Sequence, residues 1–325
     1  MDEMAERFAI VVITWNSARY LRRCAEGIAS QSLAPAEVVV IDNASADGSA
    51  ELAGSLLPGA TVIRNATNRG FSVAANQGIA ATTAELVLLL NPDVMLGERY
   101  CEEIVAALAR AGSEFGAATG RLLRGEGDAI VPTGVVDSLG IRMTRNGRHL
   151  DAGAGEPDRG PDRDVEVFGV SGAAAVYRRT MLDDCRVFGE VFDVDFFAYR
   201  EDADLAWRSR VFGWKALLVT AATAWHVRRV TPEVRASLPP EINMHSVKNR
   251  FLLRIKNEGI GLALRNGAFE LVRDAAVVGA ALTIERSSLP AFSWLWKNRA
   301  SILAKRAEIQ RRRRVEDRDL VRWFD

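Results

Sequence analysis

The fold is decided by a nine-residue stretch of the sequence, ELVLLLNPD at residues 85–93. Its continuous run of Val and Leu is typical of a strand that is buried on both faces. Pro92 cannot donate a hydrogen bond to a sheet, so the strand stops there and leaves Asn91 and Asp93 at its carboxyl end. A strand of this kind lies inside a sheet that is covered by helices, which indicates an α/β protein.

The segments around this strand alternate between the periods of strand and helix. Strands and helices that alternate through short loops predict parallel βαβ units in a doubly wound, mostly parallel sheet. In such sheets ligands bind beyond the carboxyl ends of the strands. The expected strands are residues 8–14, 37–41, 61–64 and 85–90, and the expected helices are residues 18–30, 48–57, 72–81 and 100–110.

The middle and the end of the chain have a different character. Residues 125–164 are rich in Gly, Asp, Arg and Pro and show little periodicity, which predicts a long loop with a hairpin. Strand character returns at residues 165–177 and 216–220, on either side of an expected helix at 201–212. From about residue 241 the pattern is helical to the end, so we expect a C-terminal helical extension.

The composition suits a globular protein with a core, since 48% of the 325 residues are hydrophobic and 26% are charged. It excludes disordered, collagen-like and disulfide-scaffold chains. Lys and Arg together number 42, as do Asp and Glu, so the overall charge gives no reason to expect nucleic acid as a partner. Residues 248–325, however, contain 17 basic and 9 acidic residues, which leaves an acidic remainder. Two parts of opposite net charge suggest that they have different functions.

Cysteine and targeting signals are mostly negative. The three cysteines lie far apart and form no C-x-x-C pair, so a zinc ribbon or a redox motif is disfavoured and a reducing cytosol is expected. The acidic N-terminus lacks the basic region of a signal peptide. The apolar run at residues 275–282 is much shorter than the roughly 20 residues of a spanning helix.

Polar residues follow the ends of three expected strands and would meet on one rim of the sheet. Asp42 can accept hydrogen bonds from a base or a ribose, although Asp42, Asn43 and Ser45 could equally cap the next helix. Asp93 can bind Mg²⁺ or Mn²⁺ on a diphosphate, although an Asn-Pro-Asp sequence alone is explained by a turn.

A second group of candidates lies near residue 200. Glu201 and Asp202 are adjacent, so they point in different directions, and one of them can face the rim. The alternative is ordinary enrichment of acids at a helix start, where the helix dipole stabilises them. His226 could be a metal ligand, a phosphate contact or a packed residue; an imidazole beside a carboxylate suits Mn²⁺ better than Mg²⁺.

In combination and in this order, the motifs resemble the family-2 glycosyltransferases of GT-A fold across nearly the whole chain. Bacterial rhamnosyltransferase-like members are the most similar, because they also carry Asn-Pro-Asp in place of Asp-x-Asp and a basic helical tail. The resemblance implies a GT-A domain made of a nucleotide-sugar half (1–115) and an acceptor half (116–250), followed by a basic helical extension (251–325). The matching segments are residues 11–16, 40–49, 68–71, 75–79, 90–93, 171–173, 192–205 and 226.

The resemblance also implies a role for particular residues. Asp202 would be the general base, with Glu201 as the second choice, and Asp93 and His226 would hold the metal. The nucleotide-sugar pocket would be lined by Thr14, Asn16, Asp42, Asn68, Gly70, Phe71, Asn76, Asn91 and Asp93. The acceptor side would be formed by Ser171, Gly172, Ala173, Asn249 and Arg250.

The implied activity is an inverting transfer of a sugar to a hydroxyl of a glycan or lipid-linked acceptor in cell-envelope polysaccharide synthesis. The implied donor is dTDP-rhamnose or a UDP-sugar, and the cofactor is Mg²⁺ or Mn²⁺. An in-line displacement at the anomeric carbon needs a base within about 2.6–3.2 Å of the acceptor hydroxyl and positive charge on the leaving diphosphate. It needs no protein nucleophile, in keeping with the absence of a catalytic triad pattern.

Three other functions were weighed against this one. A nucleotidyltransferase of related fold would want a glycine-rich loop after the first strand, and residues 14–19 contain no glycine. A non-catalytic sugar-binding or scaffold protein would not need Asp93, Glu201, Asp202 and His226 together. A dinucleotide oxidoreductase would carry G-x-G-x-x-G after the first strand, which this chain lacks.

The basic tail allows two interpretations. A basic helical segment with aromatic residues such as Trp294 and Trp296 can lie on an anionic membrane surface. The alternative is a charged face on helices that pack against the catalytic domain or a second subunit, so an oligomer is allowed. We expect a cytoplasmic protein, with peripheral contact at the inner face of the cell membrane under the first interpretation.

Overall fold

The computed structural model describes residues 7–228 and 240–325. Its first half contains four parallel strands in the order β4-β1-β2-β3, as the sequence predicts. Val and Ile fill both faces of the central strand β1, so the sheet must be covered on each side. The bounds are β1 (Phe8–Thr14), β2 (Glu37–Asp42), β3 (Thr61–Arg64) and β4 (Leu86–Leu90).

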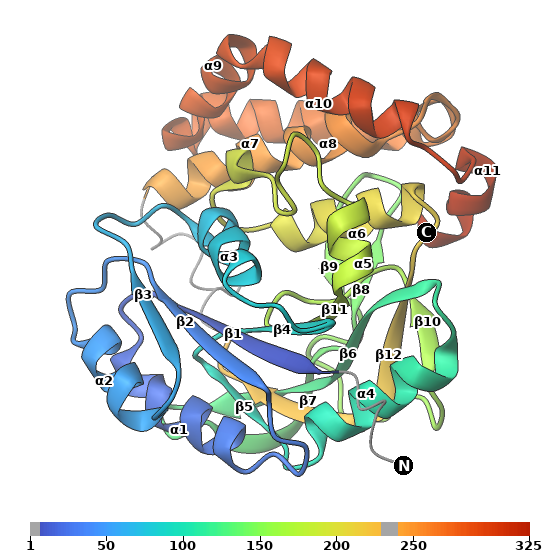
Figure 1. The fold of residues 1–325 in the computed structure, drawn as a ribbon. Coiled ribbons are helices and arrows are strands. Elements are labelled where there is room, and N and C mark those ends of the chain that lie inside the picture. Colours follow the sequence, from blue (N-terminus) through green and yellow to red (C-terminus); the bar gives the residue numbers. More distant parts are fainter. Residues whose placement is uncertain (1–6, 229–239) are drawn as a thin grey trace.

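Helices cover both faces of this sheet, as Figure 1 shows. Val11 and Ile13 of β1 face one core together with Ala74 and Ala75 of α3. Ile10 and Val12, which alternate with them, face a second core that is closed by α1, α2 and α4. The predicted helices are confirmed as α1 (Ala18–Ala29), α2 (Ser49–Leu56), α3 (Phe71–Ala80) and α4 (Tyr100–Ala111).

The second half extends the sheet in the order β10-β12-β6-β11-β4. β11 is antiparallel to both β4 and β6, whereas β12 is parallel to β6, so the sheet as a whole is mixed. The strand expected at 165–177 is two strands, and the strand expected at 216–220 is longer. The bounds are β5 (Val94–Leu96), β6 (Phe115–Glu126), β10 (Val165–Val167), β11 (Ala174–Arg178) and β12 (Lys215–His226).

The prediction of a long loop at residues 125–164 is only partly right. The expected hairpin exists as β8 (Ile141–Met143) and β9 (His149–Asp151), but β7 (Val131–Ser138) pairs with β6 and was missed. Pro132 and Gly134 interrupt the apolar pattern of β7. A strand at the edge of a sheet tolerates both residues because part of its backbone needs no ladder partner.

The C-terminal helices form a layer over the face of the sheet that carries α3, α5 and α6 (Figure 1). α7 runs through the boundary expected between residues 250 and 251. No helix in the described ranges is both long and apolar enough to cross a membrane. The bounds are α5 (Arg179–Asp184), α6 (Glu201–Val211), α7 (Pro240–Asn257), α8 (Ile260–Thr283), α9 (Pro290–Lys297), α10 (Arg299–Arg311) and α11 (Asp317–Leu320).

Buried ion pairs hold the tail on the rest of the protein. Lys256 of α7 lies 2.5 Å from Asp193 and 3.0 Å from Asp204. Lys305 of α10 lies 2.6 Å from Asp193 and 2.7 Å from Asp195. The basic excess of the tail therefore neutralises acids of the preceding domain, which favours the packing interpretation for these side chains.

Candidate active site

Two buried oxygens without partners lie side by side at the carboxyl ends of β1 and β2. Thr14 and Asp42 are neighbours in the strand register, and both are almost fully buried. Thr14 Oγ1 and Asp42 Oδ1 have no hydrogen-bond partner among the residues that the structure describes. Since buried polar atoms are nearly always paired, this edge suits a ligand that supplies donors to the two oxygens.

The loops after β1 and β2 are joined by reciprocal hydrogen bonds. The amide of Asn16, at φ 48°, donates to Ser45 Oγ at 2.9 Å, and Asn16 Oδ1 accepts from the amide of Ala46 at 2.9 Å. Asp42 Oδ2 accepts from the Ser45 amide at 3.0 Å. α2 begins after Gly48 with no side-chain cap, so the alternative in which Asp42 and its neighbours cap that helix is wrong.

A network around Asn68 shapes the loop that precedes α3. Asn68 Oδ1 accepts from Asn43 Nδ2 at 3.0 Å and from the Gly70 amide at 2.9 Å. Gly70 has φ +83°, and a Cβ there would lie 2.6 Å from Phe197. Only glycine fits this close approach. The loop before α3 is thereby fixed against the segment that precedes α6.

Two further residues of the predicted nucleotide-sugar pocket, Phe71 and Asn76, also pack against the segment that precedes α6. The ring of Phe71 meets the ring of Phe192 edge to face, with centroids 6.3 Å apart. Asn76 Nδ2 donates to the Phe192 carbonyl at 2.7 Å, and Asn76 Oδ1 accepts from the Phe192 amide at 2.9 Å. Both polar atoms of the Asn76 side chain are therefore used by the backbone of Phe192. In the predicted donor pocket, Asn76 supports the surrounding structure.

The tripeptide at residues 171–173 connects the Asn-Pro-Asp turn to the start of α6. The Asn91 amide donates to the Ala173 carbonyl at 2.9 Å. The Gly172 amide donates to Asp202 Oδ2 at 3.1 Å, and Ser171 is buried beside it. Side chains predicted for the donor, the acceptor and the base thus lie along one continuous edge.

Glu201 and Asp202 occupy different environments although they are adjacent. Burial, reinforced by the charge of Asp202, holds the pKa of Glu201 well above its usual range, and Glu201 Oε2 has no partner within residues 7–228 and 240–325. Burial also raises the pKa of Asp202, while hydrogen bonds from the Gly172 and Ala203 amides favour its charged form. The amide hydrogen bonds favour the charged form of Asp202, which a general base requires, whereas burial and the charge of Asp202 disfavour the charged form of Glu201.

Asp93 and His226 face each other, as the predicted metal pair requires. His226 Nε2 lies 3.5 Å from Asp93 Oδ1, and β5 and β12 hold the two residues in place. His226 Nδ1 is 2.8 Å from Asp137 Oδ2. Burial disfavours the charged imidazole, but hydrogen bonds and charge from Asp137 and Asp93 prevail and raise the pKa of His226 to about 10.

The residues around this pair decide how well it fits a metal. A metal-binding His usually turns its second nitrogen toward a carboxylate, as His226 does toward Asp137. Among the described residues no group of three or more His, Cys, Asp or Glu side chains could hold a metal. The pair suits an ion that takes one or two ligands from the protein and the others from a diphosphate.

Asp137 was missed in the sequence because it lies in the unpredicted strand β7. It is fully buried and binds Arg228 Nε at 2.6 Å, while Arg228 also reaches Asp151 at 2.6 Å. Burial disfavours the charged form of Asp137, but hydrogen bonds and charge from His226 and Arg228 prevail and lower its pKa. The separation of 89 residues between Asp137 and His226 left no local signal.

Asn249 and Arg250 are buried away from the rim contacts described above. Asn249 Nδ2 donates to the carbonyls of Phe196, Ala198 and Tyr199 at 2.8–2.9 Å. Arg250 Nε lies 3.5 Å from Asp274 of α8. Asn249 thus supports the turn before Glu201, and Arg250 joins α7 to α8.

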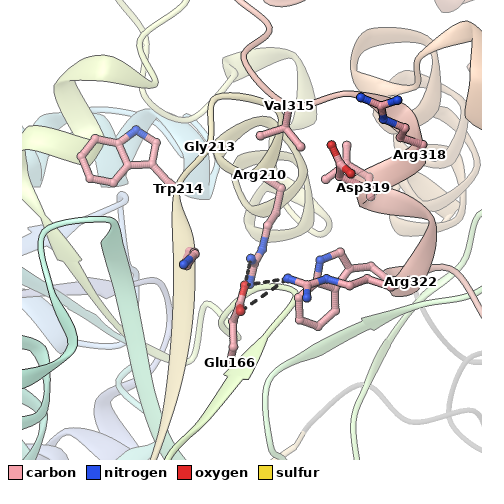
Figure 2. A pocket seen from close by; sticks show the side chains of 11 residues that line it. Glu166, Arg210, Gly213, Trp214, Val315, Arg318, Asp319 and Arg322 are labelled. Carbon is pink, nitrogen blue, oxygen red and sulfur yellow. Dashed lines mark hydrogen bonds and ion pairs between the residues drawn. The ribbon is translucent and has the colours of Figure 1, made fainter.

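A cavity of about 500 Å³ lies between the end of α6, β10, β12 and the C-terminal turn at Val321–Trp323 (Figure 2). Arg210 reaches Glu166 and stacks over Trp323 at 4.5 Å, and Arg322 lies 3.3 Å from the same carboxylate. None of the predicted site residues lines this cavity. Its ion pairs attach the C-terminal turn to the edge of the sheet.

A mixed sheet with helices on both faces and a polar edge at the carboxyl ends of its parallel strands is typical of α/β proteins that bind a ligand at that edge. A family model described as glycosyl transferase family 2 matches residues 9–186, more than half of the chain, and the protein belongs to that family. Membership decides against the nucleotidyltransferase alternative.

Relatives and solved structures agree with this assignment. The N-acetylglucosaminyl-diphospho-decaprenol L-rhamnosyltransferase of Mycobacterium tuberculosis (strain H37Rv) is 26% identical over 250 residues, which cover 69% of this chain and 76% of the relative. A PGL/p-HBAD biosynthesis glycosyltransferase of Mycobacterium bovis is 31% identical over 106 residues, 32% of this chain and 41% of the relative.

Solved structures share the fold at low sequence identity. The mannosyltransferase PcManGT from Pyrobaculum calidifontis, in complex with GDP-Man and Mn²⁺, has a TM-score of 0.53 and 20% identity over 93% of this chain and 84% of that chain. GalNAc-T7 with UDP, GalNAc and Mn²⁺ has a TM-score of 0.59 and 14% identity over 78% of this chain and 48% of that chain. The GT-A fold is therefore confirmed.

Proposed function

We propose that the protein is an inverting glycosyltransferase that moves rhamnose or a related hexose from a nucleotide-diphospho-sugar to a hydroxyl of a glycan or lipid-linked acceptor in cell-envelope polysaccharide synthesis. The observation that carries the proposal is the continuous edge from Thr14 and Asp42, through Asn91 and Asp93, to Asp202. The rhamnosyltransferase among its relatives, whose name states a diphospho-decaprenol acceptor, supports the sugar and the acceptor class.

The donor side of this edge binds the nucleotide. Asp42 Oδ1 and Thr14 Oγ1 take the donors of the base or the ribose, because both oxygens are buried and lack partners in the described part of the chain. The Asn16–Ser45 and Asn68–Gly70 hydrogen bonds hold the two loops that border the nucleotide. dTDP-rhamnose and UDP-sugars are the proposed donors.

The acceptor side supplies the base. The two oxygens of Asp202 each accept one amide hydrogen bond, and each keeps a lone pair for the acceptor hydroxyl. Asp202 takes the proton of the acceptor hydroxyl. At the same time the hydroxyl oxygen bonds to the anomeric carbon of the donor sugar, and the bond between that carbon and the nucleotide diphosphate breaks. The sugar changes configuration because there is one displacement and no protein-bound intermediate. Burial and the charge of Asp202 favour the protonated form of Glu201.

Asp93 and His226 would hold Mg²⁺ or Mn²⁺ on the diphosphate, with Asp137 orienting the imidazole. When bound, such an ion supplies positive charge to the leaving group. Support comes from two solved GT-A structures whose descriptions include Mn²⁺ together with UDP or GDP-Man.

A thermal-shift panel of dTDP-rhamnose and UDP-sugars, with and without Mn²⁺, tests the donor assignment. A ligand that binds only the folded protein raises the unfolding temperature. We expect a metal-dependent shift in the wild type and its loss in Asp93→Ala. A shift of equal size in Asp93→Ala, with and without Mn²⁺, would contradict the metal site, and no shift with any nucleotide sugar would contradict the function.

We also propose a peripheral contact with the membrane that holds a lipid-linked acceptor. Trp296 is 69% exposed, Arg299 stacks over its ring at 4.4 Å, and Lys297 is exposed beside it. An aromatic ring flanked by cations suits an anionic interface. Flotation with anionic vesicles should fall when Trp296 and Lys297 are changed to Ala; unchanged flotation would contradict this contact.

A further inference from the structure

Helix α8 keeps most of its large apolar side chains exposed, whereas an ordinary surface helix buries them. Its buried residues are the polar Asn266 and Glu270 and the apolar Leu262 and Ala281. Arg254 of α7 lies 3.8 Å from Glu270 and 2.8 Å from Asp274. α8 is therefore attached largely through ion pairs and Leu262, and most of its large apolar side chains are left on the outside.

The outer face carries one continuous apolar stripe along all 24 residues of the helix. Within residues 260–284, all of them described, Arg265 is the only exposed charged residue. Leu264 and Leu271 are 82% and 72% exposed. The spacings within the stripe are three or four residues, which places all its members on one face. The stripe consists of Ile260, Leu264, Ala268, Leu271, Ala275, Val278 and Leu282.

The order of side-chain sizes along this stripe is the same in both directions. Two large residues are followed by Ala268, then Leu271, then Ala275, then two large residues. A two-fold interface requires such self-complementarity, because each residue meets its counterpart through the symmetry axis. With Leu271 on the axis, Leu264 of one helix meets Val278 of the other, and the two alanines lie within one residue of opposite positions and allow close approach.

We propose that the α8 stripe binds the α8 stripe of a second copy of this chain, antiparallel, with Leu271 on the two-fold axis. Each large apolar side chain removes on the order of 100 Å² from water when buried. The large residues of the stripe and Val272, which is 75% exposed beside it, give roughly 600 Å² for each copy. The total of about 1,200 Å² reaches the size of a stable, specific interface.

A lipid surface explains the stripe less well than a second copy does. An interfacial helix usually has basic residues beside its apolar face, and here only Arg265 is exposed. A lipid surface also imposes no order on side-chain sizes, so the symmetric pattern would have no cause. Lipid is therefore the competing outcome in the experiment.

The oligomeric state of the full chain tests the proposal. Light scattering during size exclusion should give twice 35.5 kDa for the wild type at micromolar concentration. Leu271→Glu should give a monomer, with a dissociation constant raised at least ~100-fold, because two charges would meet on the axis. Leu303→Glu, the same change on α10 at a residue that is 54% exposed, is the matched control and should stay dimeric.

Cysteine cross-linking tests the antiparallel geometry. The native Cys24, Cys101 and Cys185 are buried, so an introduced thiol on α8 is the reactive one. Leu271→Cys should cross-link to itself. Leu264→Cys should not, because its two copies would lie about 20 Å apart, but it should cross-link to Val278→Cys in a mixture. Self-linking at all three positions would overturn the antiparallel arrangement.

Two outcomes would overturn the proposal as a whole. One is a wild-type monomer at every concentration together with no cross-link at position 271. The other is a monomer that floats with vesicles and loses flotation in Leu271→Glu, which would assign the stripe to lipid.

Discussion

At the scale of single residues, neighbours in the sequence have different chemical environments. Glu201 is buried and its pKa is held well above the usual range, whereas Asp202 is half-buried and accepts two amide hydrogen bonds. The sequence singled out both carboxylates as candidates. It could not rank them by environment, because Gly172, which contacts Asp202, lies 30 residues away.

We expect Asp202→Asn to lower kcat by at least ~10²-fold with donor affinity nearly unchanged, because an amide cannot accept the acceptor proton. Glu201→Gln should keep most of the activity, since Gln resembles the neutral acid that is already present. A base whose pKa is raised must lose its proton, so kcat/KM of the wild type should rise with pH through that pKa. Steady-state kinetics of the two variants measure this, and the reverse ranking would assign the base to Glu201.

Asp137→Asn should weaken binding of Mn²⁺ in the presence of UDP by about 10–100-fold, because His226 loses the carboxylate that orients its ring. Asp151→Asn is the matched control: Asp151 binds the same Arg228 but has no hydrogen bond to His226 among those described. Titration calorimetry measures both affinities. Equal losses of Mn²⁺ affinity in the two variants would show that metal binding depends on Arg228 and not on the orientation of the His226 imidazole.

At the scale of elements, the turn before α6 depends on a helix of the tail. Phe197, Tyr199 and Arg200 all have positive φ, between 64° and 72°, which is unfavourable for residues other than glycine. The Asn249 side chain offsets that cost by donating to the carbonyls of residues 196, 198 and 199. The turn positions Glu201 and Asp202, so α7 acts on the site through Asn249.

Asn249→Ala should lower the free energy of unfolding by about 2–4 kcal/mol, since it leaves several buried carbonyls without a donor. Asn266→Ala on α8 is a suitable control. It removes an equally buried amide that has no hydrogen-bond partner among the described residues, so little stability should be lost. Urea unfolding distinguishes them, and similar losses in both variants would contradict the role of Asn249.

The contact between α7 and α8 should depend on pH. Burial and the charge of Glu270 raise the pKa of Glu258 from 4.5 to about 8, although Arg254 and Arg306 also face it and Asp274 faces Glu270. Stability from a raised pKa is present below the ordinary value and is lost as pH rises through about 8. From pH 6 to 9, the wild type should therefore lose more thermal stability than Glu258→Gln. Parallel curves would contradict this.

The elements that the sequence predicted well are those whose pattern is local. The strands β1, β2 and β4 are continuous β-branched or Leu runs, and α1 has a clear apolar stripe. β7 was missed because Pro132 and Gly134 disrupt its pattern. The supporting roles of Asn76 and Asn249 could not be predicted either, since their partners are backbone groups up to 116 residues away.

At the scale of the whole molecule, basic residues of the tail pair with acidic residues of the rest of the protein, so much of the charge asymmetry of the sequence is neutralised within the fold. Arg314 and Lys256 of the tail pair with Asp184 and Asp204 of the catalytic domain. Asp193 receives two lysines, and this holds its pKa below the usual range despite its burial. The 17 basic residues from Lys248 onward therefore give only a small surplus for surface contacts such as the one proposed at Lys297.

Lys305→Met should cost about 3–5 kcal/mol of unfolding free energy, because it leaves buried carboxylates with one partner fewer. Lys297→Met, an exposed lysine one helix earlier, should cost almost nothing. Denaturant unfolding measures both. Equal stability of the two variants would show that Lys256 alone compensates Asp193.

The same lysines are synthesised well after the carboxylates with which they pair. Asp193 is made 112 residues before Lys305, which at ~5–20 residues per second is a delay of roughly 6–20 s on the ribosome. Until α10 is synthesised, Asp193 and Asp195 lack Lys305, one of the cations that pair with this segment in the folded protein. The segment before α6, which leads into the turn that carries Asp202, therefore gains this cation only once α10 has been synthesised.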